Sequence, residues 1–155
     1  MKTKTLGLTL ILCLAAGAFC LAADDPMMGT WKLNEAKSKL APGSPKNNTV
    51  IYTAVEDQIK VTVDGTDAQG KSTHSEWTGK FDGKDYAVTG DSMSDMRSYT
   101  MAGKDTLQMT NKKDGKVTVT GSVTIAADGK TRTVTTTWTD EKGVKVTSTA
   151  VYDKS

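Results

Sequence analysis

The sequence predicts an all-β protein, a single up-and-down antiparallel β-barrel of eight to ten strands. The first observation is a series of glycine turns at nearly even spacing, among them the Asp-Gly pairs at 82–83, 114–115 and 128–129. Asp-Gly favours tight hairpins because glycine tolerates positive φ. The second observation is the alternation of apolar and polar residues between these turns, as in 58–65 and 116–126, which is typical of strands with one face in solvent. A run of hairpins this long closes into a barrel, since closure removes exposed edges.

Each element follows from the same two signals. Asn34 is a suitable cap for one short helix after the first strand, over 34–40, which the Pro-Gly-Ser-Pro sequence at 42–45 would end. Threonine is abundant in the remaining segments, as expected for a solvated pleated face. The predicted strands span 28–33, 48–55, 58–65, 71–80, 84–89, 94–101, 104–111, 116–126, 130–139 and 143–153.

The first 23 of the 155 residues predict a cleaved signal peptide, followed by a barrel domain over 24–155. A cationic start precedes the apolar run 6–21, and Ala22-Ala23 provides a small-residue cleavage site. Cleavage would remove Cys13 and Cys20, the only cysteines. We therefore expect a secreted or periplasmic protein without thiols, and the alternative is a lipoprotein attached through Cys20.

Charge excludes several classes of partner. The chain has 20 Lys and Arg against 18 Asp and Glu, and loss of Lys2 and Lys4 with the signal peptide leaves 20 − 2 = 18 of each. Nucleic acids and anionic membranes attract a local surplus of Lys and Arg, so we expect no nucleic-acid partner and no stable membrane insertion. The oligomeric state is not predicted.

No enzymatic motif stands out. His74 and Glu76 share one face of a predicted strand and could in principle transfer a proton or hold a metal, but they are more simply a half-exposed strand pair. One His and no Cys do not make a zinc site of the usual kind. We expect no catalytic residue, no metal and no cofactor.

The sequence Gly29-Thr30-Trp31-Lys32-Leu33 resembles the first strand of the calycins, which include the lipocalins, the fatty-acid-binding proteins and the avidins. In those families the Trp closes one end of the barrel, so the resemblance implies a structural role for Gly29 and Trp31 at a barrel end. The whole chain also resembles a group of small secreted bacterial proteins with a lipocalin-like barrel.

The end of the chain, 150–154, is similar to the final strand of the fatty-acid-binding proteins. There an Arg-x-Tyr pair contacts the ligand, and Tyr152 matches the Tyr while Ala150 stands in place of the Arg. The resemblance implies that Tyr152 contacts a ligand inside the barrel.

Arginine is scarce, with only Arg97 and Arg132 among the basic residues. Alternation places Arg132 on one face with Trp138, and inside a barrel its charge would need a carboxylate, an aromatic face or a bound anion. In one interpretation Arg132 and Tyr152 bind an anionic head group. In the other, one arginine covers Trp31, as in lipocalins, and the second lies on the surface. The alternation leaves the direction of Arg97 open, and the predicted ligand-binding residues are Arg132, Tyr152, Arg97 and Trp138.

These patterns predict a non-enzymatic secreted or periplasmic protein that holds a small lipophilic or amphiphilic ligand inside a β-barrel. Hydrophobic residues make up 37% and aromatic residues 6% of the chain, and these low fractions favour a partly polar or hollow interior. The alternative is an envelope or interaction protein whose barrel is filled and which has no small-molecule ligand.

Overall fold

The structure is a computed structural model that describes residues 25–155, and the predicted signal peptide over 1–23 lies outside the described residues. The described part of the chain contains ten strands, and they confirm the predicted fold class. Their bounds are β1 Gly29–Leu33, β2 Lys46–Val55, β3 Gln58–Thr66, β4 Ser72–Gly79, β5 Tyr86–Thr89, β6 Met96–Met101, β7 Thr106–Lys113, β8 Lys116–Ile125, β9 Thr131–Thr139 and β10 Lys145–Lys154.

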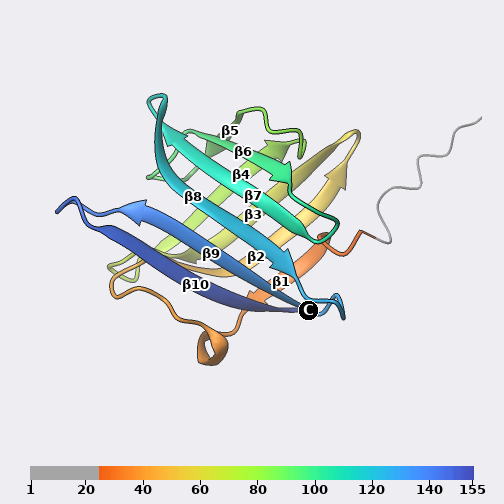
Figure 1. Cartoon of the computed structure of the whole chain (residues 1–155), viewed down its shortest axis with the longest axis horizontal. Coiled ribbons are helices and arrows are strands. Elements are labelled where there is room, and N and C mark those ends of the chain that lie inside the picture. Colours follow the sequence, from red (N-terminus) through yellow and green to blue (C-terminus); the bar gives the residue numbers. More distant parts are fainter. Residues whose placement is uncertain (1–24) are drawn as a thin grey trace, which may run out of the picture.

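The strands form one closed up-and-down barrel in which every pair is antiparallel (Figure 1). Each strand pairs with the next along the chain, and β1 closes the barrel by pairing with both β2 and β10. In each strand alternate residues therefore point inward, as the period-two pattern predicted. Within residues 25–155, no helix is long and apolar enough to cross a membrane.

The short helix expected over 34–40 is instead a 3-10 turn, η1, at Glu35–Lys37. The Asn34 side chain caps it and accepts a hydrogen bond from the Lys37 N–H. The turn ends there because the chain straightens at once, and Lys39 exchanges two backbone hydrogen bonds with Thr149 of β10. Pairing with a strand edge thus replaces further helical turns.

Large side chains fill the end of the barrel where β1 begins and β10 ends, called here the closed end. Trp77 packs edge-on against Tyr99, with ring centroids 4.9 Å apart, and also contacts Phe81 and Tyr86. Leu107 and Trp31 are fully buried in the same cluster. Aromatic pairs of this geometry add about 0.5–1.5 kcal/mol each beyond the area they bury.

The opposite end, called here the open end, is lined by smaller and more polar side chains. The strand register places there the inward-facing Val63, Thr73, Ser75, Thr136, Trp138 and Val146. All six remain partly exposed, whereas Trp31, Trp77, Tyr99, Leu107 and Ile125 at the closed end are buried.

Candidate functional site

The barrel wall is interrupted where β1 ends. β1 has 5 residues, whereas β2 and β10 have 10 each. β1 therefore joins its two neighbours only as far as Leu33. Beyond that point residues 34–45, the bridging segment, cover the space between β2 and β10. Lys39 pairs with Thr149, and the Ala41 N–H donates to Ser148 Oγ at 3.2 Å.

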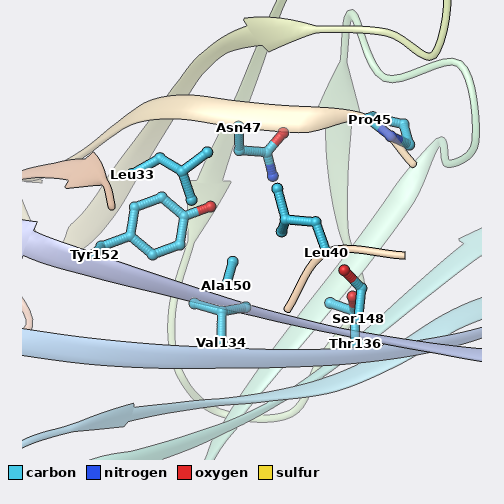
Figure 2. Close-up of a pocket in the computed structure, with 9 residues that line it drawn as sticks. All are labelled: Leu33, Leu40, Pro45, Asn47, Val134, Thr136, Ser148, Ala150 and Tyr152. Atoms are coloured by element: carbon cyan, nitrogen blue, oxygen red, sulfur yellow. The ribbon is translucent and has the colours of Figure 1, made fainter. Parts of the chain in front are cut away.

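A pocket of about 60 Å³ lies beneath the bridging segment (Figure 2). No lining residue carries a formal charge. The lining combines aliphatic side chains with hydroxyl and amide groups, and consists of Leu33, Leu40, Pro45, Asn47, Val134, Thr136, Ser148, Ala150 and Tyr152.

Tyr152 is the most buried polar contributor to the pocket, with 3% of its surface exposed. Its hydroxyl points into the pocket (Figure 2), and it has no hydrogen-bond partner among the described residues. Burial raises the pKa of Tyr152 to about 12, although the nearby Arg132 charge acts in the opposite direction. At neutral pH the phenol therefore keeps its proton and can donate it in a hydrogen bond.

Arg132 lies behind Tyr152, enclosed by aromatic rings. It is 2% exposed, and its guanidinium carbon lies 4.6 Å from the Tyr152 ring centroid and 5.1 Å from those of Trp31 and Tyr52. Its Nε is buried without a hydrogen-bond partner, and no carboxylate of residues 25–155 forms an ion pair with it. Three cation–π contacts accommodate the charge, an arrangement that matches the interpretation in which an arginine covers Trp31.

Trp31 itself is fully buried at the closed end, and its indole Nε1 donates to the Met27 carbonyl at 3.1 Å. The Lys154 ammonium lies 5.1 Å from its ring centroid. Gly29 permits this approach, because a Cβ at its position would lie 3.1 Å from Lys154 Cε. Its φ of 106° is also unfavourable for residues with a side chain.

Arg97 faces inward on β6, and the interpretation that the second arginine lies on the surface is wrong. Arg97 is 8% exposed because the register pairs it with inward-facing Tyr86 and Asn111. Its Nη2 donates to Asp91 Oδ2 at 2.9 Å and its Nε to Asn111 Oδ1 at 2.8 Å. A carboxylate and an amide thus compensate its burial.

The four predicted ligand-binding residues do not form one constellation. Tyr152 lines the pocket, Arg132 lies behind its ring, and Trp138 faces inward nearer the open end. Arg97 lies on β6, three strands from β9. The contact of each residue with a ligand remains a prediction.

Most residues that line the pocket were not predicted from the sequence. Ser148 and Ala150 alternate with Tyr152 on β10, so the period-two pattern was a sufficient signal for these two. Leu40 and Pro45 come from the bridging segment, whose path over the barrel has no sequence signature.

The outer surface of β3 and β4 carries a charged cluster around the His74–Glu76 pair. His74 Nδ1 lies 2.7 Å from Asp64 Oδ1, and Lys60 Nζ lies 2.7 Å from Glu76 Oε1. The hydrogen bond with Asp64 is the main cause that raises the pKa of His74. All four side chains are well exposed, as expected for a strand pair on the outer face.

The fold and the site define a closed ten-stranded β-barrel with a small uncharged side pocket. No protein-family model matches the chain. No curated protein matches it either. It is similar to a solved structure described as "Structure of EF1p2_mFAP2b bound to DFHBI", with 11% identity, a TM-score of 0.47, and coverage of 84% of this chain and 94% of that one. The ten-stranded barrel is consistent with the resemblance to the calycins, and membership in that superfamily remains a prediction.

Proposed function

We propose that this protein is a non-enzymatic, secreted or periplasmic binding protein that holds the end of a small amphiphilic molecule in the pocket beneath the bridging segment. The observation that supports this function is the interruption of the barrel wall beyond Leu33, with a pocket beneath the segment that covers it. A purely structural barrel would gain stability by filling such a space, because interiors are otherwise close-packed.

The size of the pocket limits what it encloses. At about 60 Å³ it is far smaller than the roughly 300–1,000 Å³ of pockets that surround a drug-sized ligand. It can therefore receive one end group and not a whole molecule.

The rest of the ligand would extend along β9 and β10 toward the open end. Thr136 and Ser148 pair across β9 and β10 at the pocket, and the next inward-facing pair in the same register is Trp138 with Val146. Trp138 is half-buried and offers an aromatic surface next to solvent. A ligand that extends in this direction would contact Trp138, one of the four predicted ligand-binding residues.

Native mass spectrometry of protein isolated from its own host tests this function. We expect a bound small amphiphile on the wild type and on Val151→Phe, whose side chain points outward, and its loss from Ala150→Phe, whose side chain would fill the pocket. Ligand-free wild type would contradict the proposal and favour the filled-barrel interaction protein.

A further inference from the structure

We infer that the pocket selects an uncharged end group that accepts hydrogen bonds, such as an amide, ester or hydroxyl, and that it rejects a carboxylate. This inference rests on the proposed function and names the chemical class of its ligand. It departs from the interpretation of the sequence in which Arg132 and Tyr152 bind an anionic head group.

The lining of the pocket carries no charge. All nine lining side chains are neutral, and the groups that can meet a polar ligand atom are the hydroxyls of Thr136, Ser148 and Tyr152 and the amide of Asn47. A carboxylate loses most of its hydration when it enters such a space, and only a charge-assisted contact compensates for that loss. No lining residue offers one.

Arg132 is the candidate cation behind the pocket. Its guanidinium lies over the Tyr152 ring at 4.6 Å, and the rings of Trp31 and Tyr52 cover it at 5.1 Å each. It does not line the pocket. The lining therefore offers an anion in the pocket no contact with this charge.

The Tyr152 hydroxyl is a donor that does reach the pocket. The Tyr152 hydroxyl points into the space and has no partner among residues 25–155. The guanidinium on its ring face draws electron density from the phenol, which makes the O–H a better donor while burial keeps it neutral. The hydroxyl is thus available to a ligand acceptor in the pocket, which would gain one hydrogen bond there.

Calorimetric titration with three probes that share one eight-carbon chain, octanamide, 1-octanol and octanoate, tests this selectivity at neutral pH. We expect octanamide and octanol to bind at least about tenfold more tightly than octanoate, since the carboxylate alone must lose a charge-stabilising hydration shell. Tyr152→Phe should weaken octanamide binding about three- to tenfold, the loss of one hydrogen bond. Tyr52→Phe is the matched control, because Tyr52 also covers Arg132 but does not line the pocket.

Two outcomes would overturn the inference, and they are distinguishable. Octanoate binding that equals or exceeds octanamide binding, or equal weakening by Tyr52→Phe and Tyr152→Phe, would refute the selectivity and leave the proposed function intact. Absence of saturable binding by all three probes to the wild type would refute the proposed function together with the inference.

Discussion

Trp31 is predicted to have a large effect on the stability of the fold. Its ring is fully buried, its Nε1 is hydrogen-bonded, and two cations lie over it. We expect Trp31→Ala to lower the free energy of unfolding by about 3–5 kcal/mol in a guanidinium melt, as for other large core aromatics. Trp138→Ala is the control, since Trp138 is only half-buried, and its cost should be smaller. A loss below about 1 kcal/mol for Trp31→Ala would contradict its role as the closure of the barrel.

His74 should give stability a dependence on pH. The carboxylate of Asp64 raises the pKa of His74 in the folded protein, so folding favours the protonated imidazole. This stabilisation is complete below the unfolded pKa of about 6.5 and is lost as the pH rises through the folded pKa.

Urea melts of wild type and His74→Asn between about pH 5 and about pH 9 measure this effect. We expect the stability difference between the two proteins to shrink as the pH rises. Added salt should reduce the difference, because the cluster is exposed and screened by ions. A difference that is constant across this range would rule out the coupling between His74 and Asp64.

The aromatic enclosure of Arg132 shows why part of the site was beyond sequence reasoning. The sequence predicted that a buried arginine needs a carboxylate, an aromatic face or an anion, and Arg132 has aromatic faces. The three rings come from β1, β2 and β10, and their convergence depends on barrel closure. Local patterns specify what a side chain requires but not which distant residue supplies it.

At the scale of elements, all ten strands were predictable because turn glycines and period-two alternation are local signals. The pocket depends on where β1 stops pairing. That position reflects competition between β1 and the bridging segment for hydrogen bonds with the edge of β10. The Asn34 N–H donates to the Val151 carbonyl, and Lys39 exchanges two backbone hydrogen bonds with Thr149. Such competition is a tertiary effect, so the strands were predicted and the pocket was not.

The bridging segment is fastened near its beginning by Asp153. Asn34 Nδ2 donates to Asp153 Oδ2 at 2.6 Å, and Lys37 Nζ lies 3.1 Å from Oδ1. The hydrogen bond from Asn34 is the main cause that lowers the pKa of Asp153. We expect Asp153→Ala to loosen the segment locally, since Asp153 holds both Asn34 and Lys37.

Amide hydrogen exchange measures this loosening. In Asp153→Ala, exchange at 37–41 should become faster while exchange at the closed end is unchanged. Asp128→Ala is the control, because Asp128 accepts the Lys130 N–H in the turn between β8 and β9 and is not bonded to the bridging segment. Equal acceleration throughout the barrel would mean that Asp153 contributes to global stability instead.

At the scale of the whole molecule, the two ends of the barrel differ in how deeply their side chains are buried. The closed end holds the fully buried Trp31, Trp77 and Leu107, whereas Val63, Thr73, Ser75, Thr136, Trp138 and Val146 at the open end remain partly exposed. A domain of this size buries roughly two thirds of its unfolded surface, which is enough for one core without covalent cross-links. The closed end can thus stabilise the rest of the barrel wall around a pocket that no side chain fills.

The predicted cleavage of the signal peptide determines whether the mature protein contains cysteine. If the signal peptide is cleaved after Ala22 or Ala23, the mature chain has no cysteine, because Cys13 and Cys20 are the only two in the sequence. We expect intact-mass measurement of the secreted protein to place its N-terminus at Ala23 or Asp24, and reducing agent to leave its thermal midpoint unchanged, since no disulfide contributes to stability. A mature species that begins at an acylated Cys20 would instead place the barrel at a membrane surface, and the amphiphile in its pocket would then come from the bilayer next to it.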